Sequence, residues 1–85
     1  MNPFKILGIL IDDNISKIDS LQYTLTKFGN VIRTRIGLNN VDEFDNKRRS
    51  IIILELFGDN QEMSKLEQAL TEINGLQIQE MNFST

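Results

Sequence analysis

Residues 4–11 read FKILGILI, and residues 50–57 read SIIILELF. Both segments are apolar at nearly every position, whereas a strand with one face in water alternates apolar and polar side chains. Two other strand-like segments, residues 31–38 (VIRTRIGL) and 76–83 (LQIQEMNF), are only partly apolar. The contrast predicts a sheet in which the first two segments are central, with both faces covered, and the other two lie at the edges.

Two amphipathic helices are predicted between these strands, because apolar residues recur there at spacings of three and four. Their apolar stripes are Ile15, Ile18, Leu21, Leu25 and Phe28 in the first helix, and Met63, Leu66, Ala69, Leu70 and Ile73 in the second. The first helix is expected over residues 15–28, with Gly29 as a left-handed residue at its end. The second is expected to begin with Asp59 and Glu62 in a capping box and to end at the Asn-Gly pair 74–75.

The order of these elements is β-α-β-β-α-β, which is typical of the ferredoxin-like α+β fold. We expect one domain over residues 1–85, with an antiparallel sheet in the order 4-1-3-2 and both helices on one face. The other face of the central strands then needs a cover, which we expect to be a second copy of the chain, in a homodimer or a dimer of dimers. That face would carry either Lys5, Leu7, Ile9 and Ile11 or else Phe4, Ile6, Gly8 and Leu10, joined by an alternate set from the third strand such as Ile51, Ile53, Glu55 and Phe57.

The two edge strands have less regular patterns. In the fourth strand the apolar phase changes between Ile78 and Met81, which predicts a bulge or a change of buried face near Glu80. The connection over residues 39–48 is longer than an ordinary hairpin loop. Alternation in the second strand places one set of side chains toward the helices and the other set on the opposite face. The first set is Ile32, Thr34, Ile36 and Leu38, and the second is Val31, Arg33, Arg35 and Gly37.

The composition removes several classes of function. The chain has no cysteine and no histidine, which excludes thiolate and imidazole metal sites, a cysteine nucleophile and the commonest general base. We therefore predict no catalytic residue, no metal and no cofactor. The net charge of −3 argues against nucleic acid as a partner, because nucleic-acid-binding domains are usually basic. No secretory signal or membrane-spanning apolar segment is recognisable, so we expect a cytoplasmic protein without a membrane partner.

Six residues are candidates for binding a small polar effector. They are Asp12, Asp13, Asn14, Arg33, Arg35 and Gly37. The first three follow the first strand at the start of a helix, where backbone N–H groups hold anionic or polar ligands, although the same side chains can simply cap the helix. The last three border the expected open face. The two guanidinium groups there could grip a carboxylate or phosphate, or form intersubunit salt bridges with Glu55 or Glu80.

Three segments resemble the family of iron-only hydrogenase system regulators. They are residues 28–38 (FGNVIRTRIGL), 50–58 (SIIILELFG) and 73–78 (INGLQI). The resemblance implies a ferredoxin-like domain of the ACT-like type, related in shape to the C-terminal domain of the nickel-responsive regulator. It also implies dimers or tetramers with a regulatory role.

The resemblance extends to particular residues. Arg35, Ile36 and Gly37 match the Arg-hydrophobic-Gly element of the family. The nickel site of the related regulator does not transfer, because it depends on histidine and cysteine. Asp13 and Asn14 occupy the turn in which amino-acid-binding ACT domains hold their ligands, although the Pro-Gly often found there is missing. An amino acid is therefore an expected effector.

Two functions follow from these patterns. The leading hypothesis is a small regulatory domain that self-associates through its sheet and binds a small polar effector, or a partner protein, at the subunit interface. The alternative is a small enzyme of the dimeric α+β barrel type, in which two sheets enclose an apolar pocket. Such an enzyme needs a roomy pocket with a polar group inside it.

Overall fold

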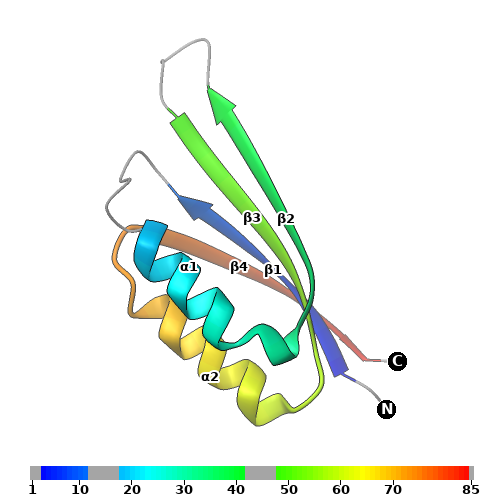
Figure 1. The fold of residues 1–85 in the computed structure, drawn as a ribbon. Coiled ribbons are helices and arrows are strands. Elements are labelled where there is room, and N and C mark those ends of the chain that lie inside the picture. Colours follow the sequence, from blue (N-terminus) through cyan, green and yellow to red (C-terminus); the bar gives the residue numbers. More distant parts are fainter. Residues whose placement is uncertain (1–2, 12–17, 42–47, 85) are drawn as a thin grey trace.

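The computed structural model describes residues 3–11, 18–41 and 48–84. Its elements are β1 (Pro3–Ile11), α1 (Ile18–Lys27), the 3₁₀ turn η2 (Gly29–Val31), β2 (Ile32–Val41), β3 (Arg48–Phe57), α2 (Asn60–Thr71) and β4 (Leu76–Ser84). The strands form one antiparallel sheet in the order β2-β3-β1-β4 (Figure 1). This arrangement confirms the predicted ferredoxin-like order, with the two continuously apolar strands at the centre.

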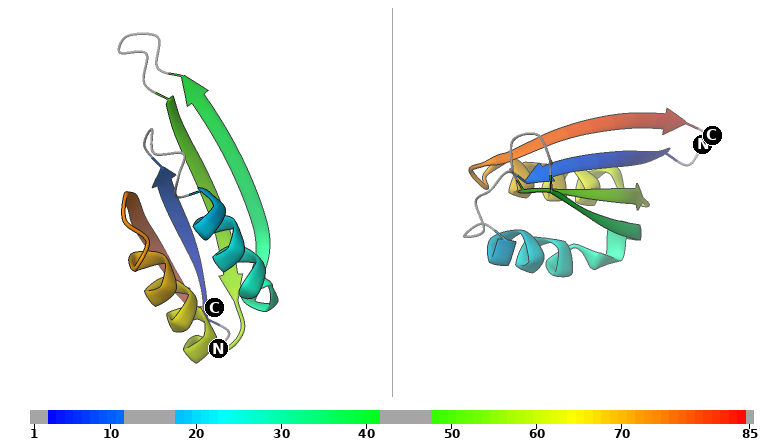
Figure 2. Two further views of the ribbon diagram at one scale, coloured as in Figure 1. Left: turned by 60° about the vertical axis from the view of Figure 1, so that its left-hand side comes forward. Right: turned by 90° about the horizontal axis from the view of Figure 1, so that it is seen from above.

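Both helices lie against the same face of the sheet (Figure 2). The core between them and the sheet is entirely apolar among the described residues. Its buried members are Leu7, Ile9 and Ile11 of β1, Leu21 and Leu25 of α1, Val31 of η2, Ile52, Leu54 and Leu56 of β3, and Met63, Leu66 and Leu70 of α2. The odd-numbered residues of β1 therefore face the helices, and the second of the two predicted sets, from Phe4 to Leu10, lies on the uncovered face.

The ends of the helices follow the predictions only in part. Asp59 caps α2, because its Oδ1 accepts a hydrogen bond of 2.8 Å from the backbone N–H of Gln61. Gly75, after α2, has the expected positive φ of 91°. Gly29 was predicted to be left-handed, and this is wrong: within the described part of the chain, only Gly58 and Gly75 have positive φ. The chain instead continues into η2, which carries Val31 into the core.

A β-bulge interrupts the pairing of β2 with β3. Ile32 pairs with Leu56, and Thr34 pairs with Glu55, so Arg33 is an extra residue on β2. An extra residue reverses the alternation of the side chains that follow it. The alternation predicted for this strand is therefore wrong from Thr34 onward.

The consequence is an exchange of faces along β2. Ile36 pairs with Ile53 and Leu38 with Ile51, so both apolar residues lie on the face that the helices leave uncovered. Arg35 pairs with the buried Leu54 and lies on the helix side. Gly37 follows the same phase as Arg35. The predicted apolar set of this strand thus points away from the core.

The pairing of β4 with β1 is regular from one end to the other, so the first predicted alternative, a bulge near Glu80, is wrong. The second alternative is confirmed, because the apolar side chains change face near Glu80. Ile78 pairs with the buried Ile9, whereas Met81 and Phe83 lie on the uncovered face and are 54% and 43% exposed. The change of phase in the sequence therefore reflects two apolar surfaces at the two ends of one continuously paired strand.

The connection between β2 and β3 is shorter than predicted. Residues 39–41 pair with residues 48–50 and extend the two strands into a ribbon that projects beyond β1 (Figure 1). Residues 42–47 lie outside the described residues. Both ends of the predicted loop, residues 39–41 and residue 48, thus belong to the sheet.

Candidate functional site

The uncovered side of the sheet is the largest feature of the described chain that the fold itself does not use. We call it the open face, and it carries two kinds of residue. The apolar residues, with Gly8 counted among them, are Phe4, Ile6, Gly8, Leu10, Ile36, Leu38, Ile51, Ile53, Phe57, Met81 and Phe83. The polar residues are Arg33, Thr34, Glu55, Gln77 and Gln79. Its β2 edge is well exposed, at 48% for Ile36 and 44% for Leu38.

Paired residues divide the open face into four rows across the strands. In the order β2, β3, β1, β4 they are Leu38, Ile51, Leu10, Gln77; Ile36, Ile53, Gly8, Gln79; Thr34, Glu55, Ile6, Met81; and, on three strands, Phe57, Phe4, Phe83. Apolar side chains run diagonally from Leu38 and Ile36 through Ile53 and Ile6 to Met81 and Phe83. We call this diagonal the apolar band. Polar side chains occupy the two opposite corners.

The polar corner on β2 and β3 is held together by contacts within the chain. Thr34 Oγ1 donates a hydrogen bond of 3.0 Å to Glu55 Oε1, and Arg33 Nη1 lies 3.8 Å from Glu55 Oε2. The Arg33 guanidinium also lies over the ring of Phe57, 4.4 Å from its centroid. The carboxylate on this largely apolar face therefore has both a hydrogen-bond donor and a counter-ion beside it.

An aromatic pair closes the far end of the open face. The rings of Phe4 on β1 and Phe83 on β4 are stacked, with centroids 4.9 Å apart and planes inclined by 11°. Offset or stacked aromatic pairs add stability beyond the area they bury. The pair gives the end of the apolar band an aromatic surface.

The structure does not bring the predicted effector residues together. Arg33 lies on the open face, whereas the Arg35 guanidinium donates a hydrogen bond to Gln22 of α1, on the helix side. The prediction that the two arginines share a face is wrong, because the bulge at Arg33 separates them. Gly37 lies on the same side as Arg35. Asp12, Asp13 and Asn14 lie outside the described residues, so their role in binding stays a prediction.

Two acidic partners were predicted for the arginines across a subunit interface, and that contact stays a prediction. Within the chain itself, Arg33 forms an ion pair with Glu55. Glu80 lies on the helix side, where it pairs in register with Leu7. It belongs to a charged cluster that the sequence did not reveal.

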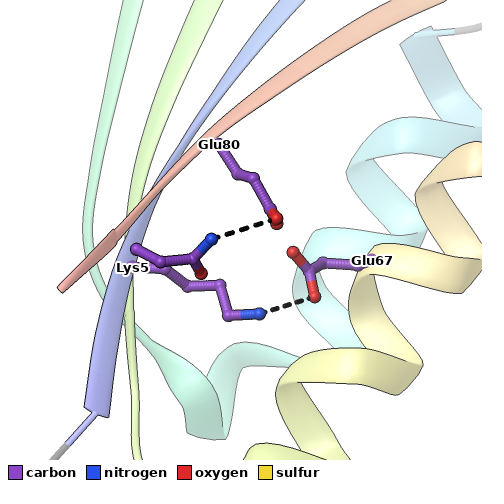
Figure 3. Close-up of polar contacts among 4 residues, drawn as sticks. Lys5, Glu67 and Glu80 are labelled. Carbon is purple, nitrogen blue, oxygen red and sulfur yellow. Dashed lines mark hydrogen bonds and ion pairs between the residues drawn. The ribbon is translucent and has the colours of Figure 1, made fainter. Parts of the chain in front are cut away.

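That cluster joins α2 to β1 and β4 (Figure 3). Lys5 Nζ forms an ion pair of 2.8 Å with Glu67 Oε2, and Asn82 Nδ2 donates a hydrogen bond of 3.1 Å to Glu80 Oε1. Burial raises the pKa of Glu67, and a hydrogen bond with Glu80 raises it further, while Lys5 opposes both effects. The same hydrogen bond, together with that from Asn82, lowers the pKa of Glu80. Lys5 therefore stands beside two carboxyl groups that interact with each other.

The described residues offer no obvious centre for metal or covalent chemistry. No group of three or more acidic side chains that could hold a metal ion occurs within ranges 3–11, 18–41 and 48–84. The core described above contains no polar side chain in those ranges. No helix in them is long and apolar enough to cross a bilayer. The open face is thus the surface on which a function can be argued.

Comparison with known proteins gives structural relatives only. No protein-family model matches the sequence, and no curated protein matches it. An uncharacterised protein from Thermotoga maritima, TM1266, superposes with a TM-score of 0.71 at 20% identity, over 99% of this chain and 100% of that one. The ACT domain of a GTP pyrophosphokinase from Chlorobium tepidum superposes with a TM-score of 0.68 at 16% identity, over 95% of this chain and 100% of that domain.

The fold is ACT-like. A further relative of this shape is CPII from Thiomonas intermedia K12, solved with ADP, AMP and acetate bound, with a TM-score of 0.58 at 12% identity over 98% of this chain and 90% of that one. The superpositions establish the ACT-like fold. Sequence identities this low do not assign the chain to the hydrogenase regulator family.

Proposed function

We propose that this protein is a small regulatory domain that self-associates through the open face and binds a small polar effector. The observation that carries the proposal is the apolar band, a continuous apolar surface on the side of the sheet that the helices leave bare. Apolar patches of this extent on small proteins are usually contact surfaces. The ACT domain and the nucleotide-bound CPII among the structural relatives support a regulatory role.

The size of the open face suits a dimer. Four strands about 4.8 Å apart and about eight residues long, at about 3.4 Å per residue, give a footprint of roughly 500 Å². Two such faces bury about 1,000 Å², which is the lower bound for a specific interface. A second copy of the chain is therefore large enough to cover the face without another protein.

Light scattering and sedimentation velocity at micromolar concentration test the self-association. We expect the mass of a dimer or a tetramer. A monomer across the whole accessible concentration range contradicts the proposal.

A thermal-shift screen with amino acids, nucleotides and organic acids tests the effector. A ligand at a hundred times its dissociation constant stabilises the folded state by about 2.7 kcal/mol, which is easily measured. A screen without a hit contradicts the effector part of the proposal and leaves self-association standing.

Two arginines provide a matched pair for locating a ligand that the screen finds, because they lie on opposite sides of β2. Loss of the shift in Arg33→Ala alone places the ligand on the open face. Loss in Arg35→Ala alone places it beside α1. Asp13→Ala and Asn14→Ala extend the test to residues 12–14, where we propose that an amino acid would bind.

A further inference from the structure

The direction of the apolar band constrains how a second copy can lie on it. From Leu38 to Phe83 the band crosses the sheet by three strand spacings of about 4.8 Å each. Over the same span it advances along the strands by six residues, each with a rise of about 3.4 Å. On a flattened sheet the band therefore runs at about 35° to the mean direction of the strands. The two corners beside it are polar, so a partner that buries the apolar band and avoids both polar corners has to follow this diagonal.

We infer that a second copy of this chain docks on the open face with a two-fold axis that runs along the apolar band. The inference rests on the proposed self-association and adds its geometry. In a two-fold dimer both copies use the same surface. The two-fold axis lies in the plane between the two sheets. It places the band of one copy on the band of the other only if it runs along the band or at a right angle to it. Any other direction places the band of one copy on a polar corner of the other.

Charge distinguishes these two directions. An axis at a right angle to the band brings Glu55 of one copy against Glu55 of the other, and facing like charges costs binding energy. An axis along the band places Glu55 near Gly8 and Gln79 of the second copy instead. There the Gln79 amide can donate to the carboxylate, and Arg33 remains its counter-ion. The axis along the band is therefore the favoured one.

The relative orientation of the sheets follows. Strands inclined by about 35° to the axis cross those of the second copy at twice that angle, about 70°. This angle is close to the orthogonal class of sheet packing and far from the aligned class, in which the strands cross at about 30°. Leu38 then faces Leu38 of the second copy, and Phe83 faces Phe83 of the second copy.

Gly8 fits this arrangement. It lies near the middle of the open face, and a Cβ added to it meets no other atom of the chain within 4 Å. Packing within the chain therefore gives no reason for a glycine there. In the dimer the bare Cα leaves room for the Glu55 group of the second copy.

Single cysteines test the direction of the axis, because the natural chain contains none. In the proposed dimer two Leu38→Cys residues lie about 10 Å apart, and two Gln77→Cys residues about 25 Å apart. A short bismaleimide should capture the Leu38→Cys dimer at least ten times more completely than the Gln77→Cys dimer. Light scattering on each variant before cross-linking reports whether a dimer is present.

The outcomes separate this inference from the proposed function. Equal capture at the two positions indicates aligned sheets, and preferential capture of Gln77→Cys indicates an axis across the band; either result overturns the inference. A dimer that is captured at neither position overturns it as well, while self-association stands. A monomer by light scattering, in these variants and in the natural chain, overturns the proposed function itself.

A second pair of variants tests the role of Gly8. Gly8→Val and Gly37→Val both add a side chain where the chain leaves free space, but on opposite sides of the sheet. We expect Gly8→Val to raise the dissociation constant of the dimer at least tenfold and Gly37→Val to leave it unchanged. Circular dichroism should show both variants folded. Dimerisation of Gly8→Val with the natural affinity would overturn the inference.

Discussion

The two faces of the sheet are built from similar residues but differ in what covers them. On the helix side, aliphatic residues of β1 and β3 are buried, and Lys5 has a carboxylate on α2 as its partner. On the open face, aliphatic residues of the same strands remain partly exposed, and the charged pair is made by neighbours on β2 and β3. The helix side is therefore a packed core, whereas the open face is an apolar surface that nothing in the described part of the chain covers. Stability of the monomer should depend on the first, and association on the second.

Adjacent residues of β3 test this division most directly. Leu54 is fully buried on the helix side, and Ile53 lies on the open face. We expect Leu54→Ala to lower the free energy of unfolding by about 2–5 kcal/mol, because a large aliphatic side chain is lost from a packed core. Ile53→Ala should cost less than half as much, and its cost should grow with protein concentration. Urea unfolding at two concentrations measures both, and equal losses would contradict the division.

A charge placed on the apolar band should weaken the association of two copies. Ile36→Glu is expected to raise the dissociation constant of the dimer by about 10- to 100-fold, about 1.4–2.8 kcal/mol, because the carboxylate loses its water without gaining a partner. Tyr23→Glu on α1 is the control, since this residue is 70% exposed and lies away from the open face. Sedimentation velocity gives the dissociation constants. A similar effect in both variants would locate the interface elsewhere.

The ion pair between Lys5 and Glu67 should matter more than a surface pair. Their side chains are only 16% and 21% exposed, so Lys5→Met is expected to cost about 1 kcal/mol at pH 7. Lys65→Met breaks a pair of 3.2 Å with Glu62 on the surface of α2, and it should cost about 0–0.5 kcal/mol. Chemical unfolding of both variants and of the natural chain, at the same pH and salt concentration, gives the two losses in the free energy of unfolding. Equal losses would show that the cluster behaves like ordinary surface charge.

The smallest expected effect is on pH dependence. Because the pKa of Glu67 is raised in the folded state, its contribution to stability is present below its usual value of 4.5 and is lost as pH rises through the folded value. Glu80→Gln removes a carboxylate that helps to raise this pKa. We therefore expect the variant to lose less stability than the natural chain between pH 4.5 and pH 7, in unfolding curves recorded at several pH values. An unchanged slope would rule out the interaction.

The sheet order and both helices could be predicted from the sequence, because each depends on how many apolar residues an element carries and at what spacing. The faces of β2 could not. Its alternating pattern continues unbroken through Thr34, whereas the bulge at Arg33 is set by pairing with β3. Alternation within a single strand contains no information on an extra residue in its pairing. The error in the candidate site has the same origin, because it placed Arg35 beside Arg33.

The cluster around Lys5 left one usable sign in the sequence. Lys5 shares the phase of the buried Leu7 and Ile9, and a lysine in such a position needs a carboxylate partner. Nothing local identifies that partner, because Glu67 lies 62 residues away along the chain. Contacts of this kind require the packing of α2 on the sheet to be known first.

The bulge at Arg33 also has an evolutionary consequence. It places Ile36 and Leu38 on the open face without altering either residue. The position of one extra residue therefore decides whether the β2 edge of the open face is apolar. Moving the bulge past Leu38 would return both side chains to the helix side and present Arg35 and Gly37 to solvent on the other. A lineage of such domains can therefore gain or lose a binding surface through one short insertion and a compensating deletion, with its inventory of core residues unchanged.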